Sequence, residues 1–366
     1  MRTPNLRLLT DKTDLGHTRL DDSQTLPEAG DGEVILTVDR FALTTNNITY
    51  AAFGDAMNYW SFFPTGQEGW GHMPVWGFAT VTDSRVPGVD PGERFYGYFP
   101  IATALKVRPE RISERGFYDA TDYRQGLPSP YNQYTRCSTD GAYVKALEDY
   151  QMLLRPLFFT SYMLADFLSD NEFFGARQLV VSSASSKTAY GAAFALREMG
   201  DPVRIALTSP SNRDYVEGLG LYQQVVDYDQ LASLDAGQPT LYVDFSGDEA
   251  LRHAVHDHFG PALVYDCYAG SATNTEFLKA DATLTPEPRF FFAPVQIRKR
   301  NQDWGPAVLS ERFGAAQRRF LQAVSDPVSG WMSLCEHRGF EAAGPVIRAL
   351  NDHGGLPREG HVVLLR

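Results

Sequence analysis

The stretch Gln178-Leu-Val-Val-Ser-Ser-Ala-Ser-Ser-Lys-Thr-Ala-Tyr-Gly191 decides how the second half of the chain folds. Residues 179–181 form a short apolar run, which is typical of a parallel strand buried on both faces. Small polar residues follow, and residues 189–199 then predict a helix rich in small side chains. A strand, a polar turn and a helix N-terminus together favour an anion site, because the first helical amides lack partners within the helix.

Two nucleotide-binding motifs compete for this turn, and neither is matched in full. A Walker A loop needs a glycine directly before Lys-Ser/Thr, and Ser186 stands there. The dinucleotide fingerprint needs glycines at the positions that Ser183, Ser186 and Ala189 occupy. A purely structural turn, with a serine capping the helix, is the alternative. The turn by itself leaves these interpretations open.

Composition excludes several classes of protein. A length of 366 residues suggests two domains, and a formal net charge of -12 argues against nucleic-acid or anionic-membrane partners. No apolar run reaches membrane-spanning length, and the first residues lack the apolar core of a signal peptide. The three cysteines lie far apart, which suits free thiols in a reducing compartment. We therefore predict a cytoplasmic protein whose partner is a small molecule.

The pattern of the chain changes near residue 156. Before it, strands at 32–43, 74–81 and after the Pro91-Gly92 turn predict a small β-barrel. After it, strands alternate with helices, which is typical of a doubly wound parallel sheet. Residues 361–365 return to the strand pattern. We predict an α/β protein in which residues 1–155 and 326–366 form one domain and residues 156–325 form the other.

Several segments have counterparts in a known superfamily. They are Glu33-Val-Ile-Leu-Thr-Val38, Val89-Asp-Pro-Gly-Glu-Arg-Phe-Tyr-Gly97 and Gly360-His-Val-Val-Leu-Leu-Arg366. They resemble the opening strand, the V-x-x-G-D-R-V-x-G turn and the closing strand of medium-chain dehydrogenases/reductases, especially the zinc-independent quinone and enoyl reductases. Trp76-Gly-Phe-Ala-Thr-Val, Tyr131-Asn-Gln-Tyr134 and residues 182–188 resemble the DUF2855 family more closely. The resemblance implies a GroES-like β-barrel domain, a Rossmann-like domain and a homodimer.

A zinc site is not expected. Zinc-dependent members of the superfamily use a Gly-His-Glu segment and a four-cysteine lobe, whereas Gly71-His-Met73 lacks the glutamate and the three cysteines are scattered. His253, His256 and His258 fall on one predicted helix, and we interpret them as a solvated helix face rather than as metal ligands. We therefore predict no metal.

The end of the second predicted parallel strand indicates which cofactor is used. NAD-specific proteins place an acidic residue there, whereas this chain has Thr208-Ser-Pro-Ser-Asn-Arg213. Hydroxyls and an arginine suit a 2′-phosphate, so we predict NADP(H); a serine here would also serve as a helix cap. The predicted cofactor-binding residues are Ser183, Ser185, Ser186, Lys187, Thr188, Thr208, Ser209, Arg213, Ser246 and Gly270.

Hydride transfer to a carbonyl compound needs a group that stabilises the developing negative oxygen, and a proton donor. In similar enoyl reductases a tyrosine does this, after a segment that Leu43-Thr-Thr-Asn-Asn-Ile-Thr-Tyr50 resembles. The catalytic candidates are Tyr50, Tyr59 and Asn47, and a packing role is the alternative for the tyrosines. The substrate-binding candidates are Tyr131, Asn132, Gln133, Lys299 and Arg300, the last two as a clamp for a carboxylate or phosphate or, alternatively, as a solvated face or subunit contact.

The sequence thus predicts a zinc-free, NADP(H)-dependent reductase of a conjugated carbonyl substrate of the enone, enoyl or quinone type. The alternative is a protein that keeps the fold without hydride transfer and binds a small acid or acyl ligand, for cofactor-free chemistry or as a non-catalytic binder. The missing glycines of the turn favour this alternative, because glycine lets the backbone approach a pyrophosphate closely.

Overall fold

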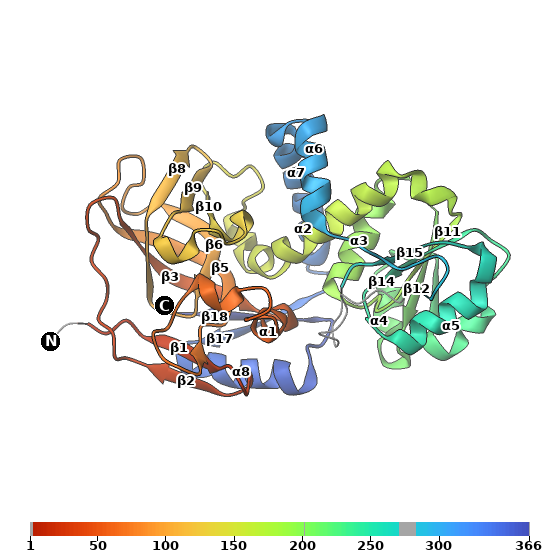
Figure 1. Ribbon diagram of the computed structural model, residues 1–366, viewed down its shortest axis with the longest axis horizontal. Helices are drawn as coiled ribbons and strands as arrows, with labels where there is room; N and C mark the ends of the chain where they lie inside the picture. The colour runs from red at the N-terminus through yellow and green to blue at the C-terminus, as the bar shows by residue number, and fades with distance from the viewer. Residues whose placement is uncertain (1–2, 201, 271–282, 366) are drawn as a thin grey trace. The chain divides into compact units, whose positions relative to one another are not determined.

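The computed structural model describes residues 3–200, 202–270 and 283–365 (Figure 1). The chain divides into two compact units, the first made of the residues up to Leu153 and from Met332 onward, the second of Leu154–Trp331. Each unit has its own sheets and helices. In the described ranges, no helix has the length and apolar character needed to cross a bilayer.

The first unit is built on sheets that are antiparallel except where β17 pairs in parallel with β18. Nine strands pair in the order β17-β18-β3-β5-β6-β10-β9-β8, with β7 also on β3, and a smaller sheet has the order β2-β1-β4. Helix α8 lies against β17, β18 and β2 (Figure 1). The elements of this unit are β1 (Arg7–Asp11), β2 (Thr18–Asp21), β3 (Val34–Leu43), α1 (Thr45–Ala52), β4 (Trp70–Gly71), β5 (Pro74–Ser84), β6 (Arg94–Pro100), β7 (Ala104–Val107), β8 (Pro109–Ser113), β9 (Gly116–Asp119), β10 (Gln133–Arg136), β17 (Ser333–Arg338), α8 (Phe340–His353) and β18 (Glu359–Leu364).

A bulge in β3 shapes the centre of this unit. The register between β3 and β5 shifts between Val38 and Arg40, which leaves Asp39 as the extra residue. Gly77 of β5 faces the bulge, and a Cβ there would lie 2.4 Å from the carbonyl oxygen of Arg40, so only glycine fits. The carboxylate of Asp39 reaches Arg94 at 2.7 Å, and Arg94 also binds Glu148 at 2.5 Å. The bulge therefore ties the sheet to the segment that begins α2.

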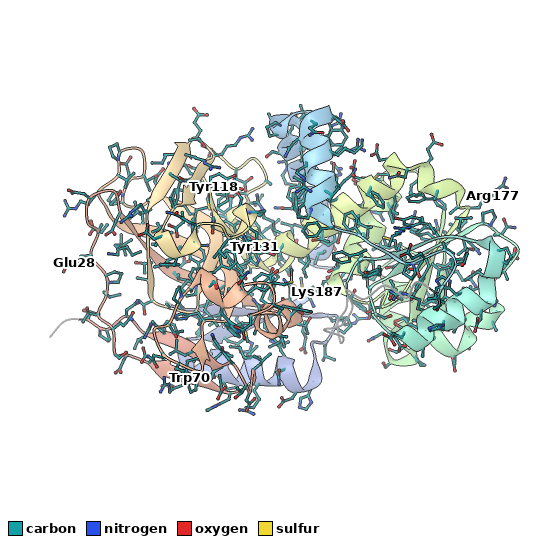
Figure 2. All side chains as sticks on the ribbon, viewed as in Figure 1. Glu28, Trp70, Tyr118, Tyr131, Arg177 and Lys187 are labelled. Atoms are coloured by element: carbon teal, nitrogen blue, oxygen red, sulfur yellow. The ribbon has the colours of Figure 1, made fainter. Side chains whose placement is uncertain are left out.

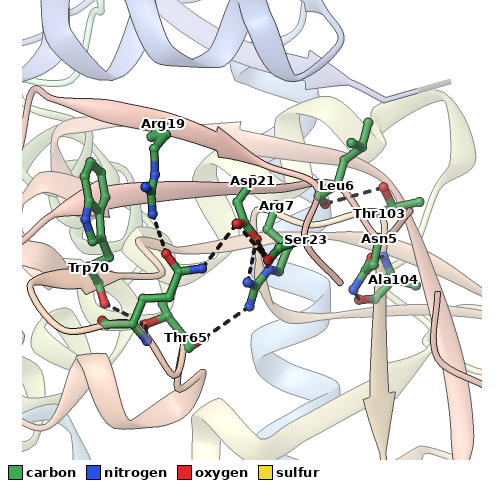
Figure 3. A network of polar contacts seen from close by, with 11 residues as sticks. Asn5, Leu6, Arg7, Arg19, Asp21, Ser23, Thr65, Trp70, Thr103 and Ala104 are labelled. Atoms are coloured by element: carbon green, nitrogen blue, oxygen red, sulfur yellow. Dashed lines mark hydrogen bonds and ion pairs between the residues drawn. The ribbon is translucent and has the colours of Figure 1, made fainter. Parts of the chain in front are cut away.

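The N-terminal strands are fixed by a separate polar network (Figure 3). The buried guanidinium of Arg7 donates to Asp21 at 2.5 Å, pairing the neighbouring strands β1 and β2. Gln67 donates to the same carboxylate at 3.2 Å and accepts from Arg19. Asn5 exchanges two hydrogen bonds with the backbone of Ala104. These contacts anchor the small sheet and the loop that leads into β4.

The second unit is a six-stranded, fully parallel sheet in the order β13-β12-β11-β14-β15-β16. This is the doubly wound order 3-2-1-4-5-6, in which ligands bind beyond the carboxyl ends of the strands where the order reverses, here β11 and β14. The elements are α2 (Glu148–Asp170), β11 (Gln178–Val181), α3 (Lys187–Arg197), β12 (Val203–Thr208), α4 (Arg213–Gly218), β13 (Gln224–Asp227), β14 (Thr240–Asp244), α5 (Glu249–Phe259), β15 (Leu263–Tyr268), β16 (Arg289–Phe290), α6 (Ala293–Asp303) and α7 (Pro306–Val324). The predicted fold class, a β-rich domain with a Rossmann-like domain, is confirmed.

Two apolar layers sandwich the parallel sheet. On one side Val180, Ile205 and Tyr242 pack with Val255 and Phe259 of α5. On the other, the rings of Phe158 in α2 and Phe320 in α7 stack with centroids 4.2 Å apart. Burial on both faces explains why the strand at 178–181 is uniformly apolar after its first residue.

Candidate functional site

Three tyrosines from separate segments meet in the first unit, and one of them, Tyr131, is labelled in Figure 2. Tyr50 comes from α1, Tyr59 opens the short helix η1 (Tyr59–Phe62), and Tyr131 lies in η3 (Ser129–Asn132). The hydroxyls of Tyr59 and Tyr131 are 3.1 Å apart, and the Tyr50 ring centroid lies 4.7 Å from that of Tyr59. The structure therefore brings together two of the predicted catalytic residues and one predicted substrate-binding residue.

An aromatic wall surrounds these hydroxyls. Trp76 of β5 donates its indole N–H to the Tyr50 hydroxyl at 3.2 Å and stacks on Tyr96 with centroids 5.4 Å apart. The ring of Tyr98 packs 4.9 Å from that of Tyr131. Tyr50 and Tyr59 are buried, whereas Trp76 and Tyr131 are partly exposed. Of these four side chains, Trp76 and Tyr131 therefore offer exposed ring surface beside the hydroxyls.

The phenols of this cluster are held in their neutral form. Burial raises the pKa of Tyr50, and the nearby Tyr59 raises it further. Burial likewise raises the pKa of Tyr59, and it raises that of Tyr131 well above the ordinary value. Each hydroxyl thus keeps its proton at physiological pH and can donate a hydrogen bond. Such a group can stabilise an oxygen that becomes negative during a reaction.

A fully buried arginine holds the segment that carries Tyr131. The guanidinium of Arg124 binds Asp119 at 3.1 Å and the Tyr134 hydroxyl at 2.9 Å. It also donates to the Tyr131 carbonyl at 2.6 Å and to the Asn132 side chain at 2.9 Å. Sequence reasoning missed Arg124 because nothing in the spacing of residues 119–134 marks it as buried. Its partners fix the backbone from which the Tyr131 ring projects.

Asn47 and Gln133, which the sequence predicts to line the site, contribute instead to the helix cap and the strand pairing of this unit. The Asn47 side chain accepts from the Thr44 amide at 2.7 Å and donates to the Pro74 carbonyl at 2.9 Å, which makes it part of the cap of α1. Gln133 begins β10 and pairs with Tyr118. The amide of Asn47 therefore joins α1 to β5. Asn46, one residue earlier, instead adjoins the Tyr50 hydroxyl and lowers its pKa, opposing part of the rise caused by burial.

The turn between β11 and α3 is braced by side chains from its own unit. Ser186 caps α3, its hydroxyl accepting from the Ala189 amide at 3.3 Å. The Tyr222 hydroxyl donates to the Ala184 carbonyl at 3.2 Å, and Asn212 donates to the Ser185 hydroxyl at 3.3 Å. Lys187 and Thr188 form the first helical turn. The turn thus has a defined shape, with the helix N-terminus at its end.

Ser182 joins this turn to the neighbouring strand β14. Its hydroxyl donates to the Asp244 carboxylate at 2.6 Å and accepts from the Phe245 amide at 2.9 Å. The same carboxylate accepts from the amide and hydroxyl of Ser246 and binds Arg252 at 2.6 Å. Ser246, a predicted cofactor contact, is therefore held in the loop after β14. Gly270 follows β15, with its nearest side-chain neighbour Phe245 at 3.8 Å from a virtual Cβ.

The predicted phosphate-binding arginine is engaged by carboxylates. Arg213 binds Glu217 at 3.0 Å and Asp227 at 3.1 Å, and it donates to the Val225 carbonyl at 3.1 Å. Thr208 is buried at the end of β12, opposite Asp227 in the register of the sheet. The hydroxyl of Ser209 meets that of Ser211 at 3.0 Å rather than an amide. An anion arriving here would compete with two carboxylates for the guanidinium.

The predicted basic clamp has a similar arrangement on α6. Lys299 binds Asp170 at 2.9 Å and Asp303 at 2.8 Å. Arg300 binds Asp166 at 2.6 Å, Asp170 at 2.9 Å and Asp303 at 3.0 Å. Both cations thus join α6 to α2 through their own ion pairs. Their charges are already compensated within the second unit.

No group of three or more His, Cys, Asp or Glu side chains could hold a metal ion in the part of the chain that the structure describes. His72 is buried, and that burial, together with the charge of Arg7, lowers its pKa to about 3. The interpretation of His253, His256 and His258 as a solvated face is wrong for His256, which is buried and lies 2.8 Å from Asp266. Asp266 comes from β15, a partner that the helix pattern alone could not reveal.

The model of a family described as "Protein of unknown function (DUF2855)" matches residues 41–354. Among curated proteins, no sequence matches the chain. Similar solved structures include CurA from Vibrio vulnificus in complex with NADPH, with 12% identity, 99% of each chain covered and a TM-score of 0.63. A quinone oxidoreductase from Coxiella burnetii has 13% identity, full coverage of both chains and a TM-score of 0.56. At these identities the likeness establishes the fold, which this chain shares with quinone and enoyl reductases.

Proposed function

The chain belongs to the DUF2855 family, and from this premise we propose that it is a zinc-free, NADP(H)-dependent reductase of a neutral conjugated carbonyl compound. The observation that carries the proposal is the Tyr59–Tyr131 hydroxyl pair, held neutral within an aromatic wall. A fold shared with a protein crystallised with NADPH supports the choice of cofactor.

The turn after β11 has one feature that favours binding the pyrophosphate of a dinucleotide and one that opposes it. It ends in the N-terminus of the eleven-residue helix α3, with the hydroxyls of Ser185 and Ser186 and the charge of Lys187 beside it. It lacks the glycines that allow closest approach, so we place the phosphates nearer to residues 185–188. The 2′-phosphate would bind Arg213 by displacing or sharing its pairs with Glu217 and Asp227.

The chemistry that we assign to this chain is stabilisation of an oxyanion, followed by protonation. When bound, NADPH would supply the hydride. The phenols of Tyr59 and Tyr131 would donate hydrogen bonds to the substrate carbonyl oxygen as it becomes negative. Because the two hydroxyls are in contact and Tyr131 is partly exposed, a proton that Tyr59 gives up would be replaced from solvent through the Tyr131 hydroxyl. The Trp76 bond to Tyr50 would keep the third hydroxyl aimed into the same cluster.

Charge suggests which conjugated carbonyl compounds fit. The surfaces offered by Trp76 and Tyr131 are neutral and planar, and Arg124 beneath them is paired with Asp119. Lys299 and Arg300 are ion-paired with Asp166, Asp170 and Asp303. This argues against their predicted role as a clamp for a substrate carboxylate. A neutral, flat quinone-like ring or enone therefore fits better than a substrate carrying a carboxylate or phosphate.

A turnover assay tests the proposal. We expect NADPH oxidation with quinones or neutral enones, and a fall in kcat of about 100-fold in Tyr59→Phe or Tyr131→Phe, typical of losing a general acid. The matched control is Tyr123→Phe, an exposed phenol outside the cluster. Full activity in both cluster variants would refute the assigned chemistry.

A second candidate function is a protein of the same fold that binds a small acid or acyl ligand without hydride transfer. The carboxylate pairs of Arg213 and the bond from the Ser183 amide to the Tyr228 hydroxyl favour it, because they occupy donors that a cofactor would use. Calorimetric titration with NADPH separates the two. Absence of binding at millimolar NADPH would favour this second function over the first.

A further inference from the structure

Ser183 has an unusual backbone conformation at the centre of the candidate cofactor turn. Its φ is 48°, in the left-handed region that glycine adopts freely and that other residues avoid because of their Cβ. Such a residue persists only where its surroundings fix it, and these sites cluster where ligands bind. Ser183 also stands at a fingerprint position where dinucleotide-binding proteins use glycine. The turn therefore has a backbone conformation typical of glycine at a position that serine occupies.

The side chain of Tyr228 supplies the contact that fixes this conformation. The backbone N–H of Ser183 donates to the Tyr228 hydroxyl at 3.1 Å. Tyr228 lies directly after β13 and is partly buried, and burial raises the pKa of its phenol. The hydroxyl is thus a neutral acceptor that keeps its own proton. On the other side of Ser183, the Ser182–Asp244 bond anchors the preceding residue.

We propose that Tyr228 is a positioning residue that replaces the missing glycine, holding Ser183 left-handed so that the first turn of α3 is aligned to bind pyrophosphate. This inference rests on the proposed cofactor. The Ser183 amide is committed to Tyr228, and the Ala184 amide donates to the Leu207 carbonyl at 3.2 Å. The Ser186 amide likewise donates to the Ser183 carbonyl at 2.8 Å, so the phosphates are assigned to Ser185, Lys187 and Thr188 and to the Ser186 hydroxyl.

A double-mutant cycle tests this role. In Tyr228→Phe, loss of one neutral hydrogen bond should weaken NADPH binding about fivefold. In Ser183→Gly, binding should be kept or improved, because glycine adopts the same φ without strain. In the double variant the effect of Tyr228→Phe should vanish, since the brace is then redundant. An equal loss from Tyr228→Phe in both backgrounds would overturn the proposal, because it would mean that Tyr228 acts independently of Ser183.

Tyr222→Phe is the matched control. It removes another hydroxyl that braces the same turn, but one bound to the Ala184 carbonyl rather than to the left-handed residue. Its effect on NADPH affinity should therefore be the same with or without Ser183→Gly. If adding Ser183→Gly changed the effect of Tyr222→Phe as much as it changes the effect of Tyr228→Phe, a specific role for Tyr228 would be contradicted.

Thermal unfolding separates failure of this inference from failure of the proposed function. Tyr228→Phe should lower the melting midpoint of the protein without cofactor by about 3 °C, and the loss should disappear when Ser183→Gly is added. If no variant binds NADPH but this pattern of melting holds, the brace stands and the cofactor assignment fails. If melting shows no coupling between the two positions, the brace itself is refuted.

Discussion

The tyrosine cluster of the first unit and the turn region of the second satisfy their polar groups in opposite ways. In the cluster, the Tyr59 and Tyr131 hydroxyls bond to each other, and Tyr50 bonds to an indole, so every partner is neutral. Around the turn, Ser182 and Arg252 bond to the buried carboxylate of Asp244. A neutral hydroxyl can exchange one partner for another at modest cost, whereas a buried charge that loses its partner is strongly destabilising. The cluster is suited to chemistry, and the carboxylate network to holding a shape.

The largest expected effect tests the carboxylate side of this contrast. In Asp244→Ala, the Arg252 guanidinium loses its 2.6 Å partner and keeps only Asp266 at 3.4 Å, and the Gly247 amide loses its acceptor. We expect the free energy of unfolding to fall by about 3–5 kcal/mol, typical of breaking a buried ion pair. Chemical denaturation measures it, with the exposed Asp229→Ala as control. A loss below about 1 kcal/mol, the size of a single hydrogen bond, would show that losing a partner costs no more around Asp244 than in the tyrosine cluster.

The second prediction concerns a buried group of the first unit that acid would charge. Burial lowers the pKa of His72 from 6.5 to about 3, so between these values the unfolded chain binds a proton that the folded chain does not. Its contribution to stability is present above pH 6.5 and is lost as the pH falls toward 3. Between pH 7 and 5 the loss should be about 2 kcal/mol.

Denaturation at the two pH values, compared between the parent and His72→Leu, isolates this contribution. Leucine is similar in volume and does not titrate, so the variant should lose about 2 kcal/mol less over the same interval. The same pH dependence in both proteins would show that His72 is protonated in the folded state as easily as in the unfolded one. The buried site of His72 would then tolerate a charge as easily as solvent does.

The smallest expected effect tests the neutral side. Tyr59→Phe should lower the free energy of unfolding by only about 1 kcal/mol, because it removes one neutral hydrogen bond and keeps the ring packing. Its effect on turnover should be far larger than its effect on stability. A loss of stability comparable to that of Asp244→Ala would make the hydroxyl pair a structural element rather than a reactive one.

Local sequence patterns predict the framework of both sites. The strand, turn and helix at 178–199 follow from periodicity and capping, and Ser186 caps the helix as a serine there is expected to. Tyr50 and Tyr59 could be proposed from the resemblance of their segment to reductases. The pairing of Tyr59 with Tyr131 could not, because it depends on how η3 is folded back against η1.

Partners that arrive from other strands could not be predicted. Arg213 and Glu217 are four residues apart on a helix and could be paired from sequence, but Asp227 reaches the same guanidinium only through the register of β12 with β13. Arg124 has its partners within one short segment, yet its burial depends on the packing of Phe62 and Phe63 against it. The conformation of Ser183 likewise depends on Tyr228, which the fingerprint comparison does not include.

The pairing of β3 with β18 has a consequence for synthesis on the ribosome. Leu43 hydrogen-bonds in register with His361, so the main sheet of the first unit cannot close until β18 has been translated. The second unit, whose strands all lie within Gln178–Phe290, can finish its sheet earlier. Until then the half of β3 that pairs with β18, Arg40–Leu43, has an unpaired edge, the kind of surface that chaperones shield in nascent chains. A truncation that removes β18 should therefore aggregate, even though it leaves the cofactor turn and the tyrosine segments in the chain.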